Sequence, residues 1–312
     1  MPFVHKQKTW QLPESKTTPL DVFLNRRLLL QRFGVGAAAS LLPSMSWASL
    51  KTNERYQLDR PLTLEPLVLQ NILFYEFGNS AEKILPLVKH LKTDPWTIEI
   101  AGLVEKPVEI GFEDLMAKVQ IEERRYRHRC VETWAMAVPW MGFQLSDLLK
   151  LAKPLASAKY VYFETFFDPS IAPRQNNNFF PWPYQDGLTI EEASNELAFV
   201  GTGLYGKPLA KQNGAPIRLV IPWKYGFKSV KSIRKVIFTE EKRQGFWEKF
   251  SPREYGFWAN VNPDVPHLQW SQKTERVLGW KDSVPTQIYN GYAEFVAHLY
   301  DKPSLKDEDL FH

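Results

Sequence analysis

The chain has 312 residues, of which 44% are apolar and 14% aromatic, with a formal net charge of +4 and a single cysteine. The first 48 residues hold six of the 39 basic side chains and two of the 35 acidic ones, so the remainder is formally neutral. This balance gives no electrostatic support for a nucleic-acid partner. One cysteine excludes an internal disulfide, and the length and apolar content suffice for one large domain.

The N-terminal segment has the composition of a bacterial export signal. Arg26 and Arg27 precede an apolar stretch from Phe33 to Leu42, and Ser46 and Ala48 occupy the small-residue positions before a cleavage point. The apolar stretch is shorter than the roughly 20 residues that span a bilayer, which argues against the alternative of a membrane anchor. The segment is therefore expected to be removed and not to contribute to the fold.

The paired arginines resemble the twin-arginine signal, which exports proteins that are already folded. Folded export suits a protein whose cofactor is inserted before secretion. We therefore predict a twin-arginine signal peptide over residues 1–48, cleaved near Ala48, and a globular domain over residues 49–312. The corresponding partner is the twin-arginine export machinery, and the corresponding location is the periplasm.

Alternation of apolar and polar residues predicts the first strand over residues 96–104. A short helix is expected over Phe112 to Val119. A second strand over 124–130 would place Arg125, Arg127 and Arg129 on one side and Tyr126, His128 and Cys130 on the other. The cysteine is expected where this strand ends and bends.

Further along the chain, Ser146 with Asp147 is expected to cap a helix that ends at Leu151. Residues 159–167 are a predicted strand, and residues 168–186 a loop rich in Pro, Asn and aromatic side chains. Thr189 and Glu192 form a capping box, which predicts a helix reaching about Phe199.

Two more strands are predicted over residues 216–223 and 232–239, separated by a turn from Tyr225 to Lys228. Strands and helices interleave without the regular spacing of a doubly wound sheet. The pattern therefore indicates a mixed α/β (α+β) fold in a single large domain.

Cys130 lies in the run Arg-Tyr-Arg-His-Arg-Cys-Val-Glu-Thr-Trp. A lone thiol in an exported protein is an inert core residue, a reactive nucleophile or a metal ligand. The neighbouring Arg125, Arg127, Arg129 and His128 predict a thiolate, which is the form that binds metals. The histidines form no metal-binding array, so the remaining ligands would come with a cofactor. A dithiolene-bearing pterin that holds molybdenum would supply two sulfurs.

Two segments could bind a phosphate-bearing cofactor. The run from Asn213 to Arg218 supplies an amide, a glycine and a guanidinium, and the run from Ser229 to Lys231 supplies a hydroxyl, backbone amides and an ammonium group. A glycine turn followed by a strand with one arginine is common in proteins. From the residues alone, a purely structural turn therefore fits these segments as well as a binding site does.

Several ordered motifs together are similar to the sulfite oxidase superfamily of molybdopterin enzymes. They are the run from Tyr126 to Trp134, Pro139-Trp140-Met141-Gly142-Phe143, Asn213 to Arg218 and Pro222 to Lys228. Within that superfamily the chain resembles the catalytic subunits of periplasmic protein-methionine-sulfoxide reductases. The resemblance covers essentially all of the chain after the export signal and implies a molybdopterin-binding catalytic domain with the sulfite-oxidase-type fold.

The resemblance implies one molybdenum held by one molybdopterin, with the Cys130 thiolate as the metal ligand. It also implies that the pterin and its phosphate are held by eight residues: Tyr75, Glu76, Thr165, Asn213, Arg218, Ser229, Val230 and Lys231. One position departs from the family pattern, because Ile72 stands where an asparagine is usual. The neighbouring Asn71 would make that contact only after a local shift of the backbone.

The implied activity is removal of oxygen from methionine sulfoxide residues of periplasmic proteins, with electrons from a haem-containing integral membrane subunit and the quinone pool. Glu132, two residues beyond the cysteine, is a candidate catalytic proton donor, or else a solvated carboxylate. Open aromatic residues would suit the substrate, and four are available, although a role in the core is the more common one for such residues: Trp134, Trp140, Trp223 and Tyr225.

Other activities fit parts of the pattern. Within the same superfamily, the alternatives are sulfite oxidation and the reduction of small S- or N-oxides. A cysteine hydrolase would need a histidine and an oxyanion donor around Cys130. A secreted binding protein without a cofactor would bury the same cysteine in its core.

Overall fold

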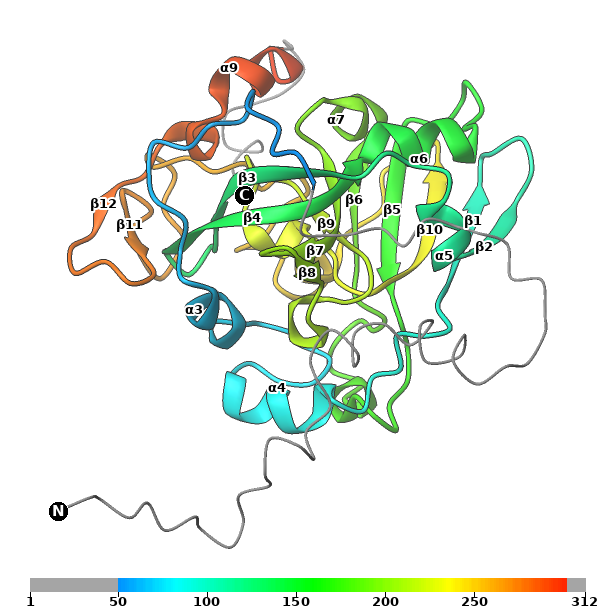
Figure 1. Cartoon of the computed structure of the whole chain (residues 1–312), viewed down its shortest axis with the longest axis horizontal. Helices are drawn as coiled ribbons and strands as arrows, with labels where there is room; N and C mark the ends of the chain where they lie inside the picture. The colour runs from blue at the N-terminus through cyan, green and yellow to red at the C-terminus, as the bar shows by residue number, and fades with distance from the viewer. Residues whose placement is uncertain (1–49, 302–312) are drawn as a thin grey trace, which may run out of the picture. The chain divides into compact units, whose positions relative to one another are not determined.

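The computed structural model describes residues 50–301, so the predicted signal peptide over residues 1–48 lies outside the described residues. Within the described part, two mixed sheets are accompanied by short helices (Figure 1). The predicted mixed α/β class is therefore confirmed. Residues of both sheets, such as Phe163 of the first and Trp140 of the second, belong to one cluster of buried apolar side chains.

The first sheet has five strands in the order β2-β1-β10-β5-β6. Only β1 and β10 are parallel, and the other neighbours are antiparallel. The alternation that predicted the first strand is present, because Ile98 and Ile100 are buried while Glu99 is exposed. The strand bounds are β1 Thr97–Gly102, β2 Val108–Gly111, β5 Tyr160–Thr165, β6 Gln185–Thr189 and β10 Ile233–Thr239.

The second sheet is built on the 11-residue strand β4, which pairs with β3 along one edge and with β7 and β11 along the other. The remaining strands extend from these, β9 and β8 beside β7, and β12 beside β11. The strand bounds are β3 Glu122–Arg129, β4 Trp134–Gln144, β7 Phe199–Leu204, β8 Lys207–Pro208, β9 Arg218–Val220, β11 Thr274–Val277 and β12 Val284–Pro285.

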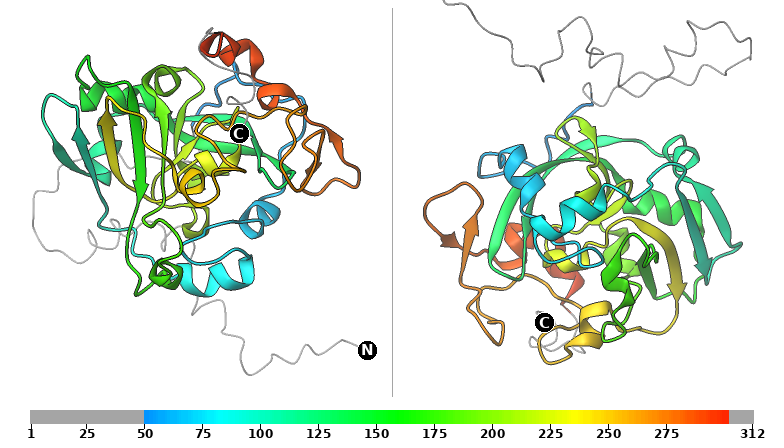
Figure 2. Two further views of the ribbon diagram at one scale, coloured as in Figure 1. Left: turned by 180° about the vertical axis from the view of Figure 1, so that it is seen from behind. Right: turned by 90° about the horizontal axis from the view of Figure 1, so that it is seen from below.

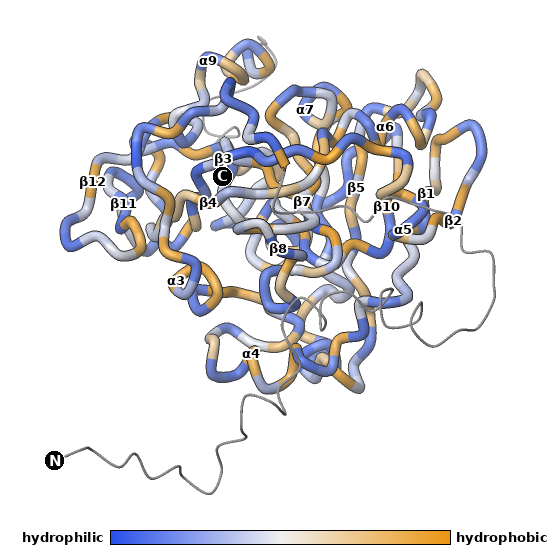
Figure 3. Tube along the Cα trace, viewed as in Figure 1, coloured by the Kyte–Doolittle hydropathy of each residue, from blue (hydrophilic) through white to orange (hydrophobic). Residues whose placement is uncertain are grey.

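Strand β4 was not predicted from the sequence, although it is the longest strand described. Nine of its residues are buried, so both faces are apolar and the alternation that marks a half-buried strand is absent. Pro139 lies inside it, opposite Arg125 of β3, and a proline argues against an internal strand. Figure 3 shows the contrast, with hydrophilic β3 beside the paler β4.

The helices in residues 50–301 are short, and none is long and apolar enough to cross a membrane. Helix α7 begins at the predicted capping box, in which the Thr189 hydroxyl accepts from the Glu192 N–H and the Glu192 carboxylate accepts from the Thr189 N–H, both at 3.1 Å. It ends at Ser194, because the chain enters β7 at Phe199. The helices are α3 Glu65–Gln70, α4 Ala81–Val88, α5 Phe112–Met116, α6 Leu145–Ala152, α7 Ile190–Ser194, α8 Phe246–Phe250 and α9 Ala293–Val296.

The cap predicted for α6 is wrong. Gln144 is the N-cap residue, and the Ser146 hydroxyl donates to the Gln144 side chain at 3.3 Å instead of capping a backbone amide. The loop predicted over residues 168–186 contains one 3-10 turn, Pro173–Asn176, and its predicted end is wrong, because Gln185 and Asp186 already pair with β5 as part of strand β6. This loop lies beside helix α8 (Figure 2).

Candidate active site

A pocket of about 830 Å³, its open mouth included, lies where strands β3, β4 and β9 of the second sheet meet several loops. This volume is in the usual range for small-molecule and cofactor sites. Nine of the ten site residues predicted from the sequence line it: Tyr75, Glu76, Cys130, Glu132, Asn213, Arg218, Ser229, Val230 and Lys231. Thr165 lies behind the pocket wall, where its hydroxyl contacts the Glu76 carboxyl group.

Cys130 is the first residue of the four-residue loop that joins β3 to β4, as the sequence predicts for the end of the strand. Its N–H donates to the Trp134 carbonyl at 2.9 Å, and its own carbonyl accepts from the Thr133 N–H at 3.1 Å. The next carbonyl, that of Val131, accepts from the Trp270 and Gln272 side chains. The loop is therefore fixed from both sides, with the thiol at the pocket surface.

The thiol does not favour the thiolate, contrary to the sequence-based prediction. Burial raises the pKa of Cys130 to about 12, the Glu132 carboxylate adds to this rise, and Arg129 and Lys231 offset only part of it. His128 contributes no charge, because burial and the nearby Arg218 and Lys231 lower its pKa to about 3. The positive charges counted from the sequence do not act on the sulfur as expected.

The reason is that each arginine of β3 already has a carboxylate partner. Arg125 is exposed and pairs with Glu123, Arg127 pairs with Asp59 at 2.6 Å, and the buried Arg129 pairs with Glu275 at 3.3 Å. Opposite charges within 4 Å cancel most of the field that either would exert on a third group.

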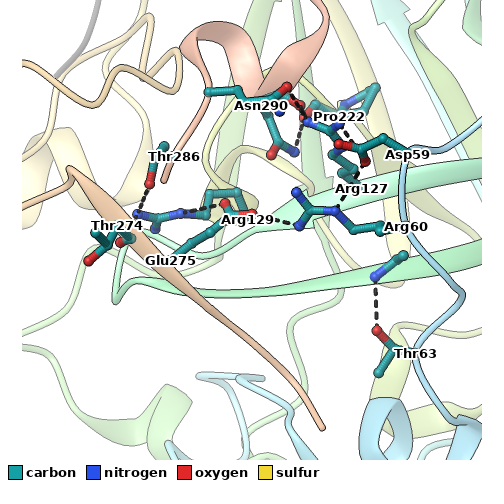
Figure 4. A network of polar contacts seen from close by, with 12 residues as sticks. Asp59, Arg60, Thr63, Arg127, Arg129, Pro222, Thr274, Glu275, Thr286 and Asn290 are labelled. Atoms are coloured by element: carbon teal, nitrogen blue, oxygen red, sulfur yellow. Dashed lines mark hydrogen bonds and ion pairs between the residues drawn. The ribbon is translucent and has the colours of Figure 1, made fainter. Parts of the chain in front are cut away.

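Behind the cysteine loop, the pairs of Arg127 and Arg129 join into one network (Figure 4). Glu275 of β11 bridges Arg129 and Arg60, the latter at 2.6 Å, and Arg60 also contacts Asp59. Arg129 donates a further hydrogen bond to the Cys130 carbonyl. The network therefore ties the cysteine loop to chain segments before α3 and after residue 272.

On the pocket side, the cations are differently placed. Arg218 is 3% exposed and donates to the carbonyls of Asn213, Leu219 and Ser229, and no carboxylate of residues 50–301 forms an ion pair with it. Burial lowers the pKa of Arg218 to about 10. Burial and Arg218 also lower the pKa of Lys231, while the Glu76 carboxyl group at the same pocket opposes this fall, and burial raises the pKa of Glu76 itself. Two basic side chains therefore meet in an enclosed space, where an anionic ligand would favour their protonated forms.

Three local features fit a bound pterin. The buried Asn213 Oδ1 has no hydrogen-bond partner among the described residues, which leaves an acceptor free for a ligand. Gly214 has a φ of +101°, and a Cβ there would lie 2.7 Å from the Lys231 Cβ. At Gly226 a Cβ would lie 2.5 Å from the His128 Nε2. Glycine at each position lets the backbone pass close to the Lys231 or the His128 side chain, where any larger residue would clash.

Other predicted features are placed as follows. The N–H groups of Ser229 and Val230 already donate to the carbonyls of Gly226 and Lys228, so these two amides are not available to a ligand. Ile72 and Asn71 both line the pocket, and the Asn71 amide donates to the Leu67 carbonyl at the end of α3. Residues 50–301 contain no group of three or more His, Cys, Asp or Glu side chains that could hold a metal ion by themselves.

Sequence reasoning missed part of the pocket lining. Trp247 and Tyr255 lie at the pocket, and the Trp247 ring is 4.8 Å from that of Tyr75. They are more than 100 residues from Cys130 in sequence, and no pattern connects them. Of the four aromatic residues considered for an open rim, only Trp134 lines the pocket. The other three are core residues with exposures of 3% or less: Trp140, Trp223 and Tyr225.

Comparisons with known proteins agree with this geometry. Residues 85–247 match the family described as the oxidoreductase molybdopterin binding domain. The chain is 45% identical over 293 residues to the protein-methionine-sulfoxide reductase catalytic subunit MsrP of Campylobacter jejuni, which covers 93% of this chain and 98% of that protein. The chain belongs to this family of molybdopterin oxidoreductases. The predicted enzyme class and the predicted superfamily are thereby confirmed.

Among solved structures, the crystal structure of the sulfane dehydrogenase SoxCD from Paracoccus pantotrophus is similar to the chain at a TM-score of 0.45 and 18% identity. The match covers 84% of this chain and 66% of that one.

Proposed function

We propose that the protein reduces methionine sulfoxide residues in oxidised periplasmic proteins, at a molybdenum ion held by Cys130 and one molybdopterin. The observation that carries the proposal is the pairing of two features in one pocket. A single thiol stands at the surface of the pocket, and two buried cations that form no ion pair with a described carboxylate lie in the same pocket. A cofactor with a phosphate group and a thiol-seeking metal would satisfy both.

The chain's own residues divide into three roles. Arg218 and Lys231 would bind the phosphate, and Asn213 would accept a hydrogen bond from the pterin through its free Oδ1. The network behind β3 would hold the Cys130 loop in place. When bound, the molybdenum cofactor supplies two-electron redox chemistry and a metal able to accept an oxygen atom.

Glu132 would handle protons. The overall reaction takes one sulfoxide, two electrons and two protons to one thioether and one water. The Glu132 carboxyl group lies at the pocket but is exposed to solvent, and burial of its inner part raises its pKa while Arg276 opposes the rise. A carboxyl group with this placement can take protons from water and deliver them inside the pocket.

The electrons would come from a separate subunit. The C. jejuni relative is named as a catalytic subunit, which implies a partner in that system. We propose that the partner here is a haem-containing integral membrane protein fed by the quinone pool. Periplasmic location through the twin-arginine signal belongs to the same proposal and depends on residues 1–48.

The test compares the wild-type protein with Cys130→Ser, both expressed with the export signal in a host that makes the cofactor. We expect about one molybdenum and one pterin in the wild type, oxidation of a reduced dye by methionine sulfoxide, and loss of both metal retention and activity in the variant. A Glu132→Gln variant serves as the matched control, because it should keep its molybdenum while its turnover falls. Wild-type protein without molybdenum, or faster dye reduction by sulfite than dye oxidation by sulfoxide, would contradict the proposal.

A further inference from the structure

Phe179 is an unusual surface residue, because 76% of it is exposed, the highest value among large apolar side chains of residues 50–301. The turn that presents it is well formed. The Phe179 N–H donates to the Asn177 side chain at 3.0 Å, and the Phe180 N–H donates to the Asn177 carbonyl at 3.1 Å. A single exposed apolar ring is common on protein surfaces, whereas a contiguous row of apolar rings marks a binding surface.

Phe179 is one end of a continuous row of rings that reaches the pocket. It lies 5.4 Å from Phe250 of α8, which is 5.6 Å from Trp247, which in turn is 4.8 Å from Tyr75. Phe180 stacks on Phe250 at 4.7 Å. Tyr75 and Trp247 line the pocket. We call Phe179, Phe180, Trp247 and Phe250 the aromatic ledge; Figure 2 shows the loop and helix that carry it side by side.

The length and continuity of the ledge indicate what covers it. Three ring-to-ring steps of about 5 Å each match roughly four or five residues of an extended chain, at about 3.3 Å per residue. Because the ledge ends at the pocket, a chain lying on it would place one residue beside Cys130. A small sulfoxide would fill the pocket and leave the ledge in water.

The chemistry of oxidised methionine gives the character of that chain. Methionine is mostly a core residue, so its neighbours in sequence are often apolar, and its sulfoxide in a core becomes reachable when the protein unfolds. We propose that the aromatic ledge binds the apolar residues that flank a methionine sulfoxide in an unfolded polypeptide. This inference rests on the proposed function and adds the class of substrate and the surface that selects it.

The experiment compares three substrates with dye as the electron source: free methionine sulfoxide, a peptide with leucines flanking the sulfoxide, and the same peptide with serines. We expect the wild type to favour the leucine peptide over the serine peptide by about tenfold in kcat/KM, from burial of the flanking side chains. In Phe179→Ser this preference should fall to about twofold, with kcat/KM for free methionine sulfoxide unchanged.

Leu155→Ser is the matched control, because Leu155 is 42% exposed and lies just before β5, whereas the loop with Phe179 follows the other end of that strand. It should keep the wild-type preference. The proposal is overturned if the wild type shows no preference, if Phe179→Ser keeps it, or if Phe179→Ser slows all three substrates equally.

A binding measurement separates this inference from the proposed function. Fluorescence anisotropy of the labelled leucine peptide needs no turnover. If no sulfoxide is reduced, the proposed function fails. The role of the ledge in peptide binding is then still supported if Phe179→Ser weakens binding of the peptide. It is overturned if Phe179→Ser binds the peptide as tightly as the wild type does. Sedimentation of the protein without peptide tests whether a second copy of the chain covers the ledge. A wild-type dimer that dissociates in Phe179→Ser would assign the ledge to that second copy and overturn the proposal.

Discussion

Two groups of buried cations in residues 50–301 differ in their partners. Behind β3, Arg127 and Arg129 each pair with a carboxylate, and Glu275 joins Arg129 to Arg60. In the pocket, Arg218 and Lys231 form no ion pair with any carboxylate of residues 50–301. Burying a charge without a partner is unfavourable, so the first group is complete as a scaffold and the second is completed by an anionic ligand.

The largest effect is expected when the paired cations behind β3 lose a carboxylate partner. In Glu275→Ala two buried guanidinium groups lose their shared carboxylate, which should lower the free energy of unfolding by about 3–5 kcal/mol. Urea unfolding followed by tryptophan fluorescence measures it. The control is Glu99→Ala, whose pair with Lys235 is 48% and 43% exposed and should contribute less than about 1 kcal/mol. Equal losses in the two variants would show that the network is not a scaffold.

A smaller effect is expected in the pocket, and it should appear in a different measurement. Lys231→Met removes a buried basic group that burial destabilises and the Glu76 carboxyl group stabilises, so the cofactor-free protein should keep its stability within about 1 kcal/mol. Loss of one charge-assisted contact to the ligand should weaken pterin retention about 10- to 100-fold, measured by pterin fluorescence after denaturation. Lys235→Met, on the exposed side of β10, should change neither. If Lys231→Met is destabilised but keeps a normal pterin content, Lys231 stabilises the fold and does not bind the ligand, contrary to the comparison.

The smallest effect is a pH dependence at Lys224, a buried cation outside both groups, which pairs with Glu192 at 2.5 Å. Burial lowers the pKa of Lys224 to about 8, and Glu192 opposes this only in part. Between pH 8 and 10.5 the unfolded chain therefore binds more protons than the folded one, and the stability contributed at this site rises with pH by about 1–2 kcal/mol.

The measurement is urea unfolding of the cofactor-free protein from pH 7.5 to 9.5, where most tyrosines are still protonated. The double variant Glu192→Gln/Lys224→Met removes both charges and is expected to lose the rise. If the free energy of unfolding rises equally with pH in the wild type and the double variant, the pH dependence comes from other groups.

Local structure was predictable where a pattern is local. The strand at Ile98 and Ile100 and the capping box at Thr189 depend on residues a few positions apart, and both are present. Strand β4 was missed because burial on both faces removes the alternation that identifies strands. The end of α7 was placed too late, since pairing of Phe199 with Val220 in β7 and β9 decides where the helix must stop.

The sequence by itself determined the family, through ordered motifs, and the set of residues that gather in the pocket, of which Cys130 and Arg218 are examples. Only the tertiary structure decided how charged those residues are and what lies beside them. Burial raises the pKa of the Cys130 thiol, and its arginine neighbours in sequence offset this only in part because they are paired with Asp59 and Glu275, far along the chain. Electrostatic fields and ring contacts depend on distance in space, and distance along the chain does not report it.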